Sequence, residues 1–148
     1  MFSFLEPFMQ DSVAEESERE RTLRRFDEFF RRHSWQRLSP VQAVYGMSDL
    51  HTDHKQNADW LERLPPKLDG AIVVAGDITH DLDVLRSTFR TLVTKFRHVF
   101  FCVGNHELWG VGRQEAARMH SIDRLMQILE LAHECGCLLY TSPSPRDS

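Results

Sequence analysis

Three short polar clusters stand out in this sequence, because each contains metal-binding groups and each follows an apolar run. They are Asp49-Leu50-His51, Gly76-Asp77 and Gly104-Asn105-His106-Glu107. Carboxylate, imidazole and amide groups without a thiolate suit a hard or borderline ion such as Mn, Fe, Zn or Mg. The clusters therefore predict a metal site rather than a structural zinc site built from cysteines.

Asp77 lies between the other two clusters in the sequence, where a carboxylate could bridge two ions. Two ions about 3.5 to 4 Å apart clamp a phosphorus centre for in-line displacement, and a metal can lower the pKa of a bound water to about 7. Water then becomes a nucleophile at neutral pH. The residue types thus indicate hydrolysis at phosphorus.

The apolar runs before the clusters are the elements that must position these side chains. Rich in Val, Ile, Phe or Tyr, they read as strands over residues 41–47, 71–75 and 99–103. Helical stretches between them give the order strand, helix, strand, helix, strand. This order predicts right-handed crossovers and a parallel sheet, whose strands all end at the edge where ligands bind. We therefore expect the three clusters to converge.

Caps and turns complete this prediction. Thr52 or Asp53 is expected to cap a helix over residues 55–64, and Thr79 or Asp81 to cap a second helix with a buried stripe. Residues 68–70 are expected to turn into the second strand.

Other residues near the clusters leave alternatives open. His98 is expected in the turn before the third strand, and a third helix is expected over residues 113–134. His80 would either contact the substrate or have no role in the site. Trp109 would either pack on the sheet, the favoured reading, or form a wall of the substrate pocket.

The three clusters, in this order and at these strand ends, resemble the calcineurin-like metallophosphoesterases. That family has Asp-x-His, then Gly-Asp, then Gly-Asn-His followed by Asp or Glu, and later a lone His and Gly-His-x-His. The resemblance implies an α/β fold of the αββα type, here a partial one: a parallel β-α-β-α-β core with an N-terminal helical extension and an incomplete sheet.

The resemblance also implies a role for each matching residue. Asp49 and His51 would bind the first of two divalent or trivalent metal ions, Asp77 would bridge the two, and Asn105 would bind the second. His106 would be the catalytic acid or a contact to the substrate phosphate. Glu107 would orient neighbouring groups.

The sequence also departs from the family. The later histidine blocks do not occur after His106, so several ligands are missing. The protein Ser/Thr phosphatase branch has Asp-Arg where His80-Asp81 stand, which argues against that branch.

Composition bounds the remaining function classes. The chain has 148 residues, 41% of them hydrophobic, and a formal charge of −4, as expected of one ordinary soluble domain. No basic patch predicts nucleic-acid binding, no apolar run predicts a membrane span, and no signal peptide is recognised. Three cysteines without a disulfide pattern favour a reducing, cytoplasmic location.

The two ends of the chain differ from the middle. Residues 1–39 form an N-terminal segment with an amphipathic helix over 12–33, and residues 40–136 form the N-terminal part of the phosphoesterase domain. Residues 137–148 resemble a translated sequencing adapter, so we expect a non-native, disordered tail and a natural chain that continues past Gly136. The alternative is a natural C-terminus rich in Ser and Pro.

The leading interpretation is a metal-dependent hydrolase that cleaves a phosphate ester with metal-bound hydroxide at a dinuclear centre. The chain as written is expected to be a truncated and inactive form. The alternative is a non-catalytic protein-interaction module of the same fold. The three complete clusters favour the enzyme.

Overall fold

The computed structural model describes residues 17–32, 38–109 and 121–139. The chain separates into two compact units, residues 1–36 and 37–148. No helix within the described ranges is long and apolar enough to cross a membrane.

The first unit contains α1, Glu18–Arg32. Its start is a capping box: the Ser17 hydroxyl accepts from the Glu20 N–H at 3.3 Å, and the Glu20 carboxylate accepts from the Ser17 N–H at 2.9 Å. The predicted helix is therefore present, beginning at residue 18. Residues 12–16 and 33 of the prediction lie outside the described residues.

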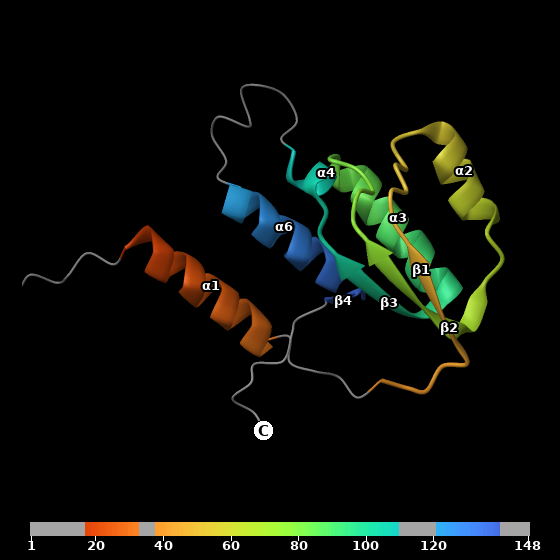
Figure 1. Ribbon diagram of the computed structural model, residues 1–148, viewed down its shortest axis with the longest axis horizontal. Helices are drawn as coiled ribbons and strands as arrows, with labels where there is room; N and C mark the ends of the chain where they lie inside the picture. Colours follow the sequence, from red (N-terminus) through yellow and green to blue (C-terminus); the bar gives the residue numbers. More distant parts are fainter. Residues whose placement is uncertain (1–16, 33–37, 110–120, 140–148) are drawn as a thin grey trace, which may run out of the picture. The chain divides into compact units, whose positions relative to one another are not determined.

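The second unit is a four-stranded parallel sheet with helices (Figure 1), in the strand order β1-β2-β3-β4. The strands are β1 Ala43–Met47, β2 Lys67–Ala75, β3 Phe96–Cys102 and β4 Leu138–Leu139. The helices are α2 Lys55–Arg63, α3 Leu82–Lys95, the short α4 Asn105–Leu108 and α6 Ser121–Glu134. The predicted parallel β-α-β-α-β core is confirmed.

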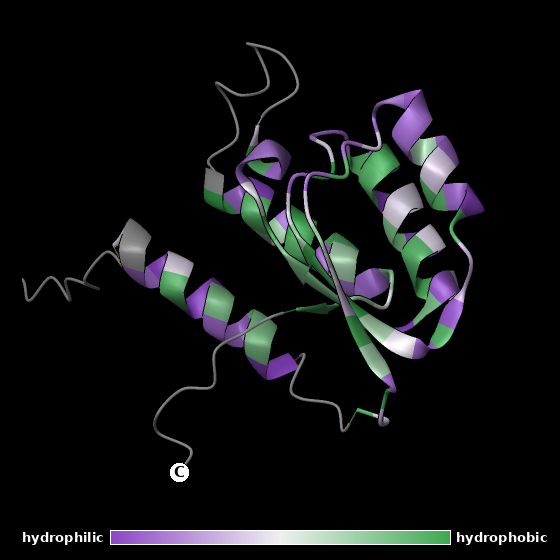
Figure 2. Ribbon diagram, turned by 45° about the vertical axis from the view of Figure 1, so that its right-hand side comes forward, coloured by the Kyte–Doolittle hydropathy of each residue, from purple (hydrophilic) through white to green (hydrophobic). Residues whose placement is uncertain are grey.

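The hydrophobic core lies between one face of the sheet and α2, α3 and α6, because right-handed crossovers between sequential strands place all the helices on one side. Figure 2 shows hydrophobic residues along the strands and hydrophilic residues on the outer side of α2. One cluster joins buried side chains of every layer: Ile72, Val74, Val99 and Phe101 from the strands, Leu61 from α2, Leu85, Phe89 and Leu92 from α3, and Ile128 and Leu131 from α6. On the other face, Val44 remains 67% exposed.

Several predicted boundaries were wrong. β2 begins at Lys67, so residues 68–70 belong to the strand and form no turn. Gly70 serves close packing instead: a Cβ there would stand 2.8 Å from a Tyr45 ring atom. His98 lies inside β3 because the strand begins at Phe96, directly after α3.

The predicted helix caps had mixed outcomes. Asp81 caps α3, since its carboxylate accepts from the N–H groups of Asp83 and Val84. For α2 the prediction was wrong: His54 occupies the cap position without a side-chain hydrogen bond. Thr52 is buried instead, with its hydroxyl 2.7 Å from that of Thr88.

The fourth strand lies within the segment that the sequence analysis assigns to the tail. Leu138 and Leu139 pair with Phe100 and Phe101 of β3, and Cys137 is buried. Residues 140–148 lie outside the described part of the chain. The adapter origin of the segment stays a prediction.

Candidate metal and phosphoester site

The three predicted clusters lie at the carboxyl ends of β1, β2 and β3, which are neighbours in the sheet (Figure 1). Backbone hydrogen bonds tie the first loop to the second. The N–H of Asp49 donates to the carbonyl of Gly76 at 3.2 Å, and the N–H of His51 donates to the carbonyl of Asp77 at 3.2 Å. The loop that carries Asp49 and His51 therefore runs directly beside the loop that carries Asp77.

Three residues of these loops have left-handed backbone conformations: Asp49 with φ 54°, His51 with φ 41° and Asp77 with φ 56°. Within the described residues they are the only non-glycine residues with positive φ. Such conformations cost about 1 to 3 kcal/mol each and concentrate at functional sites. All three are predicted metal ligands.

The second and third loops approach closely at two glycines, Gly76 and Gly104. A Cβ on Gly76, whose φ is 73°, would stand 2.5 Å from the Gly104 Cα, and a Cβ on Gly104 would stand 2.5 Å from Asp77 Oδ1. The His106 N–H donates to Asp77 Oδ1 at 2.9 Å. The two glycines therefore allow the loop with His106 to come into contact with Asp77.

Glu107 joins the second and third loops through its carboxylate. The residue is fully buried, at 0% exposure. One oxygen accepts from the N–H groups of Gly104 at 2.7 Å and Asp77 at 3.1 Å. The other accepts from the N–H groups of Ile78 and Thr79. The sequence analysis assigned Glu107 only a general orienting role. Its spacing of three residues after Gly104, as in a capping box, is a sequence signal for this contact.

His106 lies among other rings of the site. Its ring centroid is 4.9 Å from that of His51, 5.6 Å from that of His80 and 4.5 Å from that of Trp109. Its Nδ1 is buried and has no hydrogen-bond partner within the part of the chain that the structure describes. His80 therefore lies beside His106, and whether it contacts substrate stays a prediction. Trp109 is 55% exposed and lies against His106, so the favoured packing role was wrong.

Arg124 of α6 is a site residue that sequence reasoning missed. Its guanidinium donates to the carbonyl of Glu107, at 3.1 Å from Nε, and to the carbonyl of His80. Arg124 thus links α6 to α4, which contains Glu107, and to the loop after β2, which contains His80. Arg124 lies in the first turn of α6, and an arginine there carries no sequence signal for such a contact.

The predicted ligands are of the types that bind a divalent cation, and the nearby His106 Nδ1 is a buried polar atom without a partner among the described residues. The side chains do not form a preassembled coordination shell. Within the described ranges, no three His, Cys, Asp or Glu side chains are arranged to hold an ion. Asn105, the first residue of α4, is exposed.

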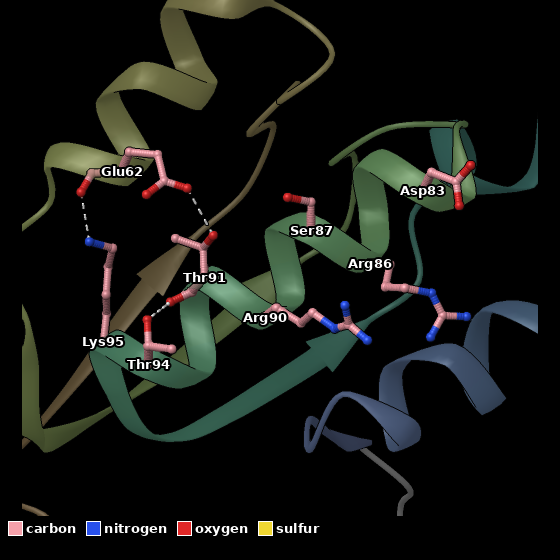
Figure 3. A pocket seen from close by; sticks show the side chains of 8 residues that line it. All are labelled: Glu62, Asp83, Arg86, Ser87, Arg90, Thr91, Thr94 and Lys95. Atoms are coloured by element: carbon pink, nitrogen blue, oxygen red, sulfur yellow. Dashed lines mark hydrogen bonds between the residues drawn. The ribbon is translucent and has the colours of Figure 1, made fainter.

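A surface hollow elsewhere in this unit is unrelated to the three clusters. It follows the exposed side of α3 next to α2 and contains none of the predicted site residues (Figure 3). Its polar groups largely bind one another: Lys95 Nζ donates to the Glu62 carbonyl at 2.8 Å, and the Thr91 hydroxyl donates to the Glu62 carboxylate at 3.1 Å. These contacts join α2 to α3.

Comparison with known proteins identifies the family of this domain. The sequence pattern of the calcineurin-like phosphoesterase family matches residues 43–138. The chain is 31% identical over 104 residues to the [acyl-carrier-protein] phosphodiesterase PptH of Mycobacterium tuberculosis, covering 70% of this chain and 32% of that protein.

The crystal structure of the phosphopantetheinyl hydrolase PptH from the same organism superposes with a TM-score of 0.61 and 29% identity. The superposition covers 72% of this chain and 38% of that one. The chain therefore spans about a third of the length of its relative. The family match includes all three clusters, and the chain belongs to the calcineurin-like phosphoesterase family.

Proposed function

We propose that this chain supplies one part of a dinuclear, metal-dependent phosphoesterase centre. The observation that carries the proposal is the left-handed backbone at Asp49, His51 and Asp77, the three predicted ligands at adjacent strand ends. Strain at these positions has a physical reason if it directs donor groups toward a common ion. The ring contact between His51 and His106 supports the same arrangement.

Each residue then has a role in the reaction. Asp49 and His51 would hold one cation, Asn105 would hold the other, and Asp77 would be a ligand of both. When bound, the cations supply Lewis acidity and an activated water. His106 donates a proton to the departing alkoxide. Because its Nδ1 is buried, Nε2 is the nitrogen that faces the substrate.

The ligands that this chain lacks would come from sequence beyond it, as the short coverage of the relative suggests. That relative is a phosphodiesterase by name, so phosphate monoesters and phosphate diesters are both appropriate substrates to assay. A cytoplasmic location is part of the proposal, since the three free cysteines are compatible with a reducing compartment.

The test replaces Asp77 by Asn in the longest chain that the source transcript encodes. Hydrolysis of 4-nitrophenyl phosphate and bis(4-nitrophenyl) phosphate is measured with and without Mn²⁺. Asp77→Asn should abolish Mn²⁺-dependent turnover. Asp69→Asn, an exposed residue near the other end of the same strand, should leave it unchanged. If Asp77→Asn retained turnover, the bridging role would be wrong, and an inactive parent chain would favour the interaction module.

A further inference from the structure

Trp109 differs from an ordinary exposed tryptophan in what it contacts. It ends α4, with its N–H donating to the His106 carbonyl at 3.3 Å. Its side chain is 55% exposed, yet the indole lies 4.5 Å from the His106 ring with an interplanar angle of 48°. Single exposed apolar side chains are common and need no functional reason. Contact with the proposed proton donor supplies one here.

The position of His106 determines where a leaving group must lie. A proton donor works within about 2.6 to 3.2 Å of the atom that it protonates. With Nδ1 enclosed, that atom must approach Nε2. Because the indole and the imidazole are in ring contact, a leaving group that reaches Nε2 comes within reach of the indole.

The other rings around His106 are less suited to this contact. His51 is a predicted metal ligand, and His80 is only partly exposed while its carbonyl is held by Arg124. Trp109 offers the largest exposed aromatic surface of the group. Aromatic rings attract one another in offset or tilted arrangements, beyond the area that they bury.

We propose that Trp109 determines specificity by stacking on the leaving group, so that this centre prefers phosphate esters whose leaving alcohol carries an aromatic ring near the ester oxygen. The proposal rests on the function proposed above, because it takes His106 as the proton donor. It adds the chemical class of the substrate.

The first experiment compares two esters with leaving alcohols of similar acidity, phenyl phosphate and hexafluoroisopropyl phosphate. Trp109→Ala should lower kcat/KM for the phenyl ester roughly three- to tenfold and leave the fluoroalkyl ester unchanged. Trp109→Phe should retain most of the preference. Trp60→Ala is the matched control, because Trp60 is 43% exposed on α2, away from the three clusters.

The outcomes separate the two proposals. An equal loss on both esters would make Trp109 a structural residue, and no loss would remove it from the site; either result overturns the inference and leaves the phosphoesterase assignment standing. Turnover of both esters that survives Asp77→Asn would overturn the phosphoesterase assignment and the inference with it.

A second measurement does not depend on turnover. Trp35→Phe and Trp60→Phe together leave Trp109 as the only tryptophan of the three. In Mn²⁺, 4-nitrophenylphosphonate should quench its fluorescence saturably, and inorganic phosphate should reverse the quenching. Binding of the phosphonate measured by equilibrium dialysis, without a change in Trp109 fluorescence, would contradict the stacking contact.

Discussion

Replacing Glu107 by Gln should destabilise the domain far more than the loss of one charge on the surface would. The wild-type carboxylate accepts four backbone N–H groups, two on each oxygen, from Gly104, Asp77, Ile78 and Thr79. A glutamine amide keeps one oxygen and replaces the other by an NH2 donor. In either orientation of the amide, two buried N–H groups then face a donor.

The magnitude follows from this count. A buried donor left without an acceptor costs about 1 to 3 kcal/mol, so two of them cost about 2 to 6 kcal/mol. Domains of this size have total stabilities of about 5 to 15 kcal/mol. Glu107→Gln should therefore remove a large part of the folding free energy, although it preserves the shape of the side chain.

Urea unfolding followed by far-UV circular dichroism at pH 7 measures the effect. Glu130→Gln is the control, since it makes the same chemical change at an exposed position on α6. It should alter the free energy of unfolding by less than about 0.5 kcal/mol. If Glu107→Gln cost less than about 1 kcal/mol, the carboxylate would not be what holds these loops together.

Two other predictions concern packing and pH. Gly104→Ala should lower the free energy of unfolding by about 1 to 3 kcal/mol in thermal or urea unfolding, because its Cβ would stand 2.5 Å from Asp77 Oδ1. Gly46→Ala is the control and should be neutral or stabilising, because a Cβ at Gly46 has nothing within 4 Å. Equal effects of the two substitutions would contradict the close approach at Gly104. Burial, together with the nearby Cys135 thiol, raises the pKa of Cys137 from 9.0 to about 12. The protonated thiol therefore stabilises the fold below pH 9, and this contribution to the free energy of unfolding falls as the pH rises toward 12. Between about pH 8 and 10.5 the free energy of unfolding should thus fall about 1 to 2 kcal/mol more in the wild type than in Cys137→Ala, and parallel curves would show that the folded and unfolded states bind this proton equally.

The convergence of the three clusters could be predicted from the sequence because each cluster follows a strand whose composition is unambiguous. Parallel topology then requires Asp49, Asp77 and Asn105 to share one edge of the sheet. What the sequence could not supply is the set of contacts among the loops. The contact of Gly76 with Gly104 depends on two backbones that approach in space, and no local pattern records it.

Element boundaries were less predictable where a local sequence pattern is compatible with two different structures. Gly70 after Asp69 resembles a turn, yet β2 continues through it, with a shift in its pairing to β3 between Lys67 and Ala71. β4 has two residues, Leu138 and Leu139, too few for any periodicity to predict. The cap of α2 was misplaced because Asp53 is a better capping residue than His54, although the helix begins at Lys55.

The strand order β1-β2-β3-β4 also bears on how the protein is made. Each strand after β1 pairs with the strand that precedes it in the sequence, so a chain leaving the ribosome can extend its sheet one strand at a time. None of the first three strands has to wait, unpaired, for a partner encoded much later. Pairing between consecutive strands keeps the loops that must close short, which lowers the entropic cost of forming the sheet.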